Sequence, residues 1–272
     1  MDKQVRIVGV PEHFNFPIMQ WVKQDASCSF DVVPEGTGKM LELLQNGNCD
    51  VAITLTEGSF KAMTNNPELV CLGVYVSSSL QWGVHVPYSS EFQNISELKG
   101  KRVAISRFNS GSHLMTRVFA ANNAWDESDF EYVTVNTLVG AVESFGNQES
   151  DVFLWEKFTT QPWVDKRNFR RLGVVPTPWP CFVIMTTKKV LAASQDHVLA
   201  FVEGVRAEAA RVKLDAESPK AIAQAFKLDL SEVEAWYSAV DWFGEFDFSS
   251  VQNDLAKFDI CPRDFDFSGQ IL

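Results

Sequence analysis

The chain has 272 residues, of which 46% are hydrophobic, and a formal net charge of −11 at pH 7. This length and apolar content provide a large core, either in one large domain or in two lobes. With an acidic balance and no basic stripe, the sequence argues against nucleic acid and an anionic membrane surface as partners, but not against a small anionic ligand held by local dipoles.

The cysteines and the amino-terminal sequence predict a cytoplasmic protein. The five cysteines are scattered and form no CxxC pair, which excludes zinc-ribbon and thioredoxin motifs and is typical of a reducing compartment. The first ten residues lead into a predicted strand and lack the charged start and apolar centre of a signal peptide. Because no apolar run is long enough to cross a bilayer, we expect no membrane span.

The first part of the chain alternates between predicted strands and helices. Strands are predicted at residues 5–10, 30–33 and 51–54, and helices at residues 16–24 and 38–46. The second of these helices has an apolar face and is followed by Gly47, a common helix-ending residue. This alternation is typical of the α/β class, with a parallel sheet covered by helices on both faces.

A second unit of similar build follows the first. Its predicted strands are residues 103–105, 132–135 and 152–155, and its predicted helices are residues 114–121 and 139–145. Two apolar strand-like segments, 74–86 and 182–185, connect the two units, so the chain is expected to cross between them twice. We therefore predict two lobes, residues 1–82 plus 185–272 and residues 83–184, with a hinge of two crossing strands.

The C-terminal third is predicted to be helical. Helices are expected at residues 198–212 and 218–226, and another begins near residue 230 with Ser231 as its cap and Glu234 in the capping-box position. Aromatic residues are dense in two later segments, 243–248 and 258–267. Such segments could form ligand platforms, but at this density we expect them to pack between helices.

Residues 106–113 are the strongest candidate for a ligand site. Small hydroxyl residues and a glycine lie here between a predicted strand and a predicted helix, where free backbone N–H groups and the helix dipole favour an anion. Arg107 adds a fixed positive charge with a planar fork of donors. We predict that this turn binds a carboxylate, sulfonate or phosphate group. The simpler alternative is ordinary capping of the helix by Ser110 or Ser112.

Polar and aromatic side chains also follow the other predicted strands, at the edge where open parallel sheets bind ligands. Each of them has a simpler explanation. His13 could act as a base, although a neutral hydrogen-bonding histidine is favoured. Trp155 could stack on a ligand or pack in the core.

No sequence motif for metal or nucleotide chemistry is complete. The chain has no HExxH or GxSxG, and its four histidines are far apart, so we expect no metal site. The run Gly36-Thr37-Gly38-Lys39 resembles the end of a P-loop. However, Val33 stands where the first glycine is needed, and Met40 stands where the Ser/Thr magnesium ligand is needed. Nucleotide hydrolysis is therefore rejected.

The order of these pieces resembles the type II periplasmic binding proteins, in particular the subgroup for nitrate, sulfonate, taurine and thiamine-pyrimidine uptake. The resemblance covers about residues 4 to 215. It rests on residues 10–14, 35–38, 47–58 and 98–104 and on the serine-rich turn that follows them. It implies two α/β lobes that close over a small molecule. It also implies a ligand shell of His13, Thr37, Thr56, Glu57, Ser106, Ser110, Gly111, Ser112 and Trp155.

We therefore predict a protein that binds a polar or anionic metabolite without a cofactor and without converting it, a cytoplasmic branch of this fold. The alternative is an enzyme similar to the cytosolic pyrimidine synthases of thiamine biosynthesis, which use pyridoxal phosphate. Those enzymes carry a Cys-Cys-Cys-x-Cys cluster that this chain lacks. Only His13 and either Lys39 or Lys61 are candidates for the histidine and lysine that they consume. A protein-interaction module is a third possibility, supported only by the aromatic C-terminal region.

Overall fold

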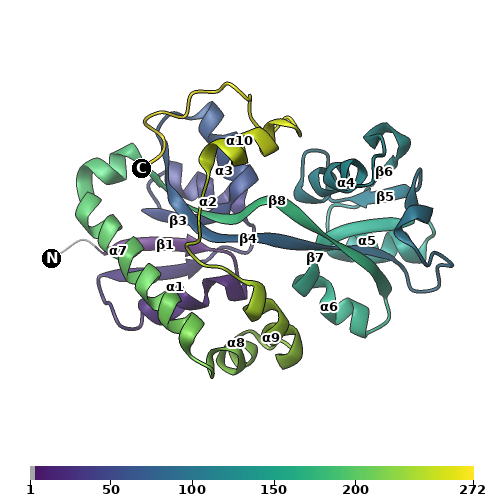
Figure 1. The fold of residues 1–272 in the computed structure, drawn as a ribbon, viewed down its shortest axis with the longest axis horizontal. Coiled ribbons are helices and arrows are strands. Elements are labelled where there is room, and N and C mark those ends of the chain that lie inside the picture. Colours follow the sequence, from purple (N-terminus) through teal and green to yellow (C-terminus); the bar gives the residue numbers. More distant parts are fainter. Residues whose placement is uncertain (1–3) are drawn as a thin grey trace. The chain divides into compact units, whose positions relative to one another are not determined.

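The structure is a computed structural model that describes residues 4–272. The chain divides into two units: unit one runs to Ser78 and resumes at Trp179, and unit two is the segment between them. The chain passes from one unit to the other in two long strands, β4 (Leu69–Pro87) and β8 (Phe169–Thr187) (Figure 1). The boundaries predicted from the sequence, 82/83 and 184/185, lie a few residues farther along these same two strands.

The strands described within residues 4–272 form one eight-stranded sheet in the order β2-β1-β3-β8-β4-β7-β5-β6, and unit one is built on its β2-β1-β3-β8 part. Its first three strands are β1 (Val5–Gly9), β2 (Cys28–Val32) and β3 (Val51–Leu55), and its first helices are η1 (His13–Asn15), α1 (Phe16–Trp21), α2 (Thr37–Gln45) and α3 (Thr56–Asn65). Strand β1 is parallel to β2 and β3, whereas β8 is antiparallel to β3. Helices cover both faces of the sheet (Figure 1). This explains why Ile7 and Ile53 are fully buried in continuous apolar runs.

The C-terminal part of unit one is helical, as predicted. Its helices are α7 (Lys188–Leu214), α8 (Ser218–Phe226), α9 (Leu230–Ala239) and α10 (Phe248–Ala256). The predicted cap of α9 is wrong: Asp229, not Ser231, is the N-cap, and its carboxylate accepts the backbone N–H groups of Ser231 and Glu232 at 2.9 and 3.2 Å. Within residues 4–272, no helix combines the length and apolar character that crossing a bilayer requires.

The aromatic C-terminal segments pack inside unit one, as expected. Phe248 stacks on Phe60 of α3 with a centroid distance of 4.5 Å, and Phe267 meets Phe60 edge to face at 5.3 Å. The side-chain amide of Gln270 donates to three backbone carbonyls near the end of α3 and the start of β4. Through these contacts, residues 248–270 pack against α3 and the start of β4.

Unit two repeats the βαβαβ order around a sheet with the strand order β4-β7-β5-β6. Its own strands are β5 (Arg102–Ile105), β6 (Glu131–Thr134) and β7 (Val152–Glu156), and its helices are η2 (Ile95–Leu98), α4 (Gly111–Asn122), η3 (Glu127–Asp129), α5 (Leu138–Gly146) and α6 (Lys157–Asp165). Strand β5 is parallel to β6 and β7, and β4 is antiparallel to β7. Helices α4 and α6 lie on opposite sides of this sheet (Figure 1).

Three α-helices, α3, α6 and α10, were not predicted individually from the sequence. Helices α3 and α6 share one feature. Both begin on the residue that directly follows a strand, without a connecting loop, at Thr56 and Lys157. Helix α6 also contains Pro162, which normally interrupts a helix. Thr56 and Glu57, which the sequence placed after a strand, therefore lie in the first turn of α3.

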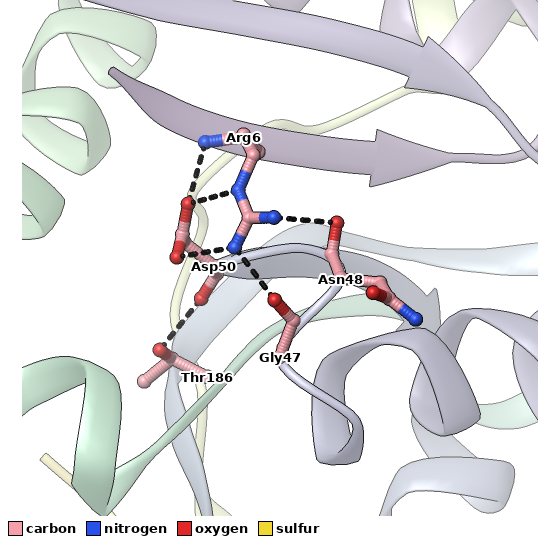
Figure 2. A network of polar contacts seen from close by, with 5 residues as sticks. All are labelled: Arg6, Gly47, Asn48, Asp50 and Thr186. Atoms are coloured by element: carbon pink, nitrogen blue, oxygen red, sulfur yellow. Dashed lines mark hydrogen bonds and ion pairs between the residues drawn. The ribbon is translucent and has the colours of Figure 1, made fainter. Parts of the chain in front are cut away.

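In each unit, an arginine–aspartate pair joins two neighbouring parallel strands near their N-terminal ends. Arg6 at the start of β1 donates its backbone N–H and two guanidinium N–H groups to Asp50, which precedes β3, and Figure 2 shows this network. Arg102 at the start of β5 makes the same three contacts with Asp151, which precedes β7. Unit two therefore repeats this feature of unit one as well as its order of elements.

Candidate functional site

The predicted turn between β5 and α4 forms a compact group of hydroxyls. Ser106, Ser110 and Ser112 are all buried, and the Ser112 hydroxyl lies 3.0 Å from that of Ser110 and 3.4 Å from that of Ser106. The Ser106 backbone N–H donates to the Ser112 hydroxyl at 2.8 Å. Ser110 is the N-cap of α4, so the ordinary capping that the sequence offered as the simpler alternative is present within this group of hydroxyls.

The tip of this turn is exposed and is held by a histidine. Arg107, Phe108 and Asn109 are exposed, and Asn109 has a positive φ of 62°. The Asn109 backbone N–H donates to Nδ1 of His113 at 3.1 Å, which requires that nitrogen to be unprotonated. Burial and the nearby Arg117 lower the pKa of His113, which favours this neutral form. The cation beside the hydroxyl group is therefore Arg107.

Trp82 of β4 also belongs to this turn, although the sequence did not suggest it. A Cβ atom at Gly111 would lie 2.8 Å from Cη2 and 3.2 Å from Cζ2 of the Trp82 ring, so the indole lies against the first residue of α4. The Trp82 side chain is buried, and its Nε1 has no hydrogen-bond partner within residues 4–272. Since Cζ2 lies on the same edge of the indole as Nε1, an unused donor lies near the N-terminus of α4. A buried donor without a partner costs about 1–3 kcal/mol, which makes this N–H a candidate for contact with a bound molecule.

Trp155, the tryptophan that the sequence suggested, contacts Trp82: the centroids of the two rings lie 6.4 Å apart in an edge-to-face arrangement. It pairs with Gly83 across the β4–β7 ladder, so no side chain stands directly opposite it. The Trp155 ring stacks on Phe153 with a centroid distance of 5.3 Å and packs on the core cluster that includes α5. Trp155 therefore lies between this core cluster and the ring of Trp82.

The structure brings together the three predicted residues Thr37, Thr56 and Glu57 in unit one. The Thr37 hydroxyl accepts the Leu55 backbone N–H at 3.1 Å, and its methyl group lies so close to Gly58 that a Cβ there would be 2.6 Å away. Thr56 is fully buried, and its hydroxyl has no hydrogen-bond partner among the described residues. These residues place the N-termini of α2 and α3 side by side.

Glu57 is an unusual carboxyl group in the first turn of α3. Its Oε2 accepts the indole N–H of the buried Trp179 at 3.0 Å. Burial raises the pKa of Glu57 to about 7, even though this indole favours the charged form. This side chain therefore changes its charge close to neutral pH.

His13 lies in unit one, where aromatic side chains enclose it. Its ring lies 4.1 Å from that of Trp236 and 4.8 Å from that of Phe14, with Phe226 at 6.2 Å. Burial lowers the pKa of His13 to about 3, so the ring is neutral at physiological pH. This agrees with the neutral histidine that the sequence favoured over a base.

The residues that a pyridoxal-phosphate enzyme would need do not fit that cofactor. The ammonium group of Lys39 pairs with Glu42 at 2.8 Å on the outside of α2, and Lys61 is exposed. Neither lysine is buried in the way that activates a Schiff-base lysine. The described residues also contain no group of three or more His, Cys, Asp or Glu side chains that could hold a metal ion.

Comparison with known proteins supports the fold. The family model of Ca3427-like periplasmic binding proteins matches residues 82–175, which lie within unit two. The solved structure of the Candida albicans CA3427 gene product, described as having the generic periplasmic-binding-protein fold, is 23% identical to this chain and has a TM-score of 0.84. The match covers 99% of this chain and 96% of that one. The fold is that of a type II periplasmic binding protein.

Two sulfonate-binding proteins share this periplasmic-binding-protein fold. The alkanesulfonate-binding protein SsuA from Xanthomonas axonopodis pv. citri, solved with bound MOPS, is 17% identical with a TM-score of 0.75, over 99% of this chain and 98% of that one. The aliphatic sulphonate-binding protein SsuA from Escherichia coli is 16% identical with a TM-score of 0.75, over 100% and 98%. No curated protein matches the chain significantly. The fold prediction is confirmed, whereas these identities do not settle which ligand binds.

Proposed function

We propose that this protein binds a small organic anion at the N-terminus of α4 in unit two. The observation that carries the proposal is the unused indole N–H of Trp82, buried against Gly111 where the backbone N–H groups of α4 begin. An anionic oxygen would accept from this donor and from the helix terminus together. The buried hydroxyls of Ser106, Ser110 and Ser112 supply further polar groups.

Charge and similarity both favour an anion as the ligand. Arg107 adds an exposed guanidinium beside the hydroxyl group. Unit two contains 10 basic and 11 acidic residues, whereas unit one contains 14 basic and 24 acidic ones, so the acidic excess lies in unit one. Structures of the same fold include an alkanesulfonate-binding protein solved with MOPS, a sulfonate. We favour a sulfonate or carboxylate over a phosphate or a pyrimidine.

The proposal includes binding without chemical conversion. A hydrolase needs a nucleophile paired with a base, or a metal-bound water. His13 and His85 are buried with pKa values of about 3, which makes them poor bases at neutral pH. That the two units close over the ligand, and that the protein works in the cytoplasm, stay predictions.

Calorimetric titration of the purified protein tests the site. The probes are ethanesulfonate, propionate, inorganic phosphate and pyrimidine. We expect the sulfonate or the carboxylate to bind and the double variant Ser110→Ala/Ser112→Ala to bind it about 10-fold more weakly or worse, since each lost hydrogen bond is worth about 1 kcal/mol. Ser144→Ala/Ser150→Ala is a matched control, because these serines also form a buried hydroxyl pair in unit two, at 2.7 Å.

A second pair of variants isolates the indole donor. Trp82→Phe removes the N–H but keeps a ring beside Gly111, and we expect it to weaken anion binding several-fold. Trp125→Phe makes the same change elsewhere in unit two, where the indole packs against Phe119 and Phe130, and is expected to leave binding close to wild type. Equal affinities for the wild type, the serine variant and Trp82→Phe would contradict the proposed site.

A further inference from the structure

His113 and Ser110 exchange hydrogen bonds with the backbone at the N-terminus of α4. The Ser110 hydroxyl accepts the His113 backbone N–H at 3.4 Å, and Nδ1 of the His113 ring accepts the Asn109 backbone N–H at 3.1 Å. The pattern resembles a capping box, in which a glutamate or glutamine at this helix position accepts a backbone N–H beside the cap. Those acceptors work at neutral and mildly acidic pH, whereas Nδ1 accepts only while it carries no proton. A single proton on His113 therefore removes the acceptor for Asn109.

Two aromatic rings hold the His113 imidazole beside the turn. Its centroid lies 5.2 Å from that of Phe108 and 4.9 Å from that of Tyr132 on β6, and both contacts are edge to face. The Phe108 and Tyr132 rings also contact each other, with a centroid distance of 5.8 Å. The imidazole therefore links two exposed residues of the turn to the body of unit two, Phe108 through its ring and Asn109 through its backbone.

We propose that His113 is a pH-sensitive switch for the anion site: the neutral ring holds residues 107–109 in place, and protonation of the ring releases them. Release weakens anion binding, because Arg107 then loses its position beside the buried hydroxyls. The inference rests on the proposed function, since it concerns the regulation of that same site.

The groups that face His113 decide when it takes up a proton. Arg117 lies one turn farther along α4, and its Nε pairs with Glu127 of η3. Burial and Arg117 lower the pKa of His113, and Glu127 partly opposes them. Burial raises the pKa of Tyr132 on β6 to about 12, so that phenol stays neutral, and Arg107 of the turn stays charged. The His113 ring is therefore neutral at neutral pH and takes up its proton below the ordinary pKa of 6.5.

Protonation also adds a positive charge near the anion, and this effect is the smaller one. His113 is half-buried, so water weakens the attraction between its charge and a bound anion. A cation in the first turn of a helix also opposes the helix dipole. The loss of the acceptor acts on the turn directly: the Asn109 N–H and the new Nδ1–H both donate, so the two groups repel each other and the turn moves away from the ring.

Amide hydrogen exchange in the ligand-free protein tests the switch independently of any ligand. NMR titration first gives the pKa of His113. Exchange of the Asn109 amide is then measured about one pH unit above and below that pKa and corrected for the intrinsic effect of pH. We expect exchange in the wild type to become about fivefold faster or more below the pKa, since the lost hydrogen bond is worth about this factor. Thermal unfolding at both pH values shows that the protein is folded.

Two variants separate the acceptor from the ring. His113→Asn removes the ring but keeps an acceptor, because Oδ1 of asparagine is bonded to Cγ as Nδ1 of histidine is. His113→Phe keeps a ring and removes the acceptor. We expect slow Asn109 exchange at both pH values in His113→Asn and fast exchange at both in His113→Phe. His197→Asn is the matched control: His197 is exposed on α7 in unit one, so its replacement should leave the wild-type pH dependence unchanged.

Binding of ethanesulfonate gives the functional readout, because this ligand keeps its charge across the pH range. Calorimetry should show the wild type binding it about fivefold more weakly below the His113 pKa than above it, and His113→Asn binding it equally at both. Glu57 titrates alike in both proteins, so the difference between them reports on His113.

The outcomes separate the switch from the proposed function. If Asn109 exchange in the wild type is the same above and below the His113 pKa, or if His113→Asn keeps the wild-type pH dependence, the switch is overturned and the anion site stands wherever ethanesulfonate binds. Tighter binding of ethanesulfonate in acid also overturns the switch, since the charge of the ring then outweighs the release of the turn. If neither ethanesulfonate nor propionate binds at either pH, the proposed function fails and this inference fails with it.

Discussion

The loops that follow the first strand of each unit have the same frame and opposite surroundings. In both units an arginine on that strand donates hydrogen bonds to an aspartate that precedes the third strand of the unit. The pairs are Arg6 with Asp50 and Arg102 with Asp151. In unit one, residues 13–15 of the loop after β1 are buried, and the indole of Trp236 lies against His13. In unit two the turn after β5 leaves Arg107 and Phe108 exposed.

The covering of the unit-one loop comes from segments distant in sequence. The hydroxyl of Tyr75 and the indole N–H of Trp242 both donate to the Phe14 carbonyl, at 2.8 and 3.0 Å. Trp236 and Phe226 belong to the C-terminal helices α9 and α8. The comparison teaches that one βαβαβ frame supports either a sealed loop or an open one, and that the C-terminal helices decide which.

The largest expected effect comes from opening the sealed loop. Trp236→Ala removes a buried indole and should lower the free energy of unfolding by about 3 kcal/mol or more. It should also raise the pKa of His13 from about 3 towards its ordinary value, because water reaches the ring. Chemical denaturation and NMR titration of the histidine measure the two effects.

Phe108→Ala is the control in unit two: Phe108 is 57% exposed, so its removal should lower the free energy of unfolding by less than about 0.5 kcal/mol. Equal losses for the two variants would contradict the difference between the loops.

The two arginine–aspartate pairs should differ in strength because their burial differs. The Asp50 side chain is 4% exposed, whereas that of Asp151 is 22% exposed. Asp50→Asn should therefore cost about 2–3 kcal/mol of unfolding free energy, because it leaves a deeply buried network with a weakened partner. Asp151→Asn should cost about 1 kcal/mol. Urea denaturation of both variants measures this, and a larger loss for Asp151→Asn would overturn the ranking.

Two carboxyl groups should give pH dependences of opposite sign. Glu57 has its pKa raised to about 7 by burial, so the folded state holds a proton that the unfolded state releases above about pH 4.5. Unfolding free energy should fall as pH rises from about 4.5 to about 7, by about 2 kcal/mol, and Glu57→Gln should remove this slope.

Asp151 provides the opposite case in unit two. Hydrogen bonding to Arg102 lowers the pKa of Asp151, so its contribution is present above its ordinary pKa and is lost as pH falls through the lowered value. Asp151→Asn should therefore reduce the loss of stability in acid and leave the slope between pH 4.5 and 7 unchanged. Denaturation at a series of pH values gives both curves, and the same sign for both groups would contradict these assignments.

Local signals were sufficient to predict the order of strands and helices and the serine-rich turn. Alternating apolar runs gave both βαβαβ units, and small hydroxyl residues before a helix marked residues 106–113. The helices α3 and α6 were missed because each begins immediately after a strand. No loop therefore separates the hydrophobic pattern of the strand from that of the helix. The capping of α9 was placed on Ser231 because two acceptable caps, Ser231 and Asp229, lie two residues apart.

The contacts that complete the candidate site could not be predicted because they join distant segments. Trp82 is buried in an apolar strand, so its sequence position predicts only a core residue. The structure shows that Gly111 lies against the edge of its ring. The available signal was Gly111. It does not have a positive φ, so its backbone conformation does not require glycine. The lack of a side chain therefore indicates that another group lies close to it. Trp155 was chosen from the sequence because it lies near the end of a strand, and in the structure its ring contacts that of Trp82.

The two strand crossings make unit two an insertion within unit one. The ends of the insertion are joined, because the Leu80 backbone N–H donates to the Thr177 hydroxyl at 3.0 Å. A ribosome therefore completes all of unit two while unit one still lacks its own part of β8, from Trp179 onward, and its four C-terminal helices. Vectorial synthesis should let the proposed anion site assemble on the nascent chain first, and the sealed loop around His13 should close only when translation ends.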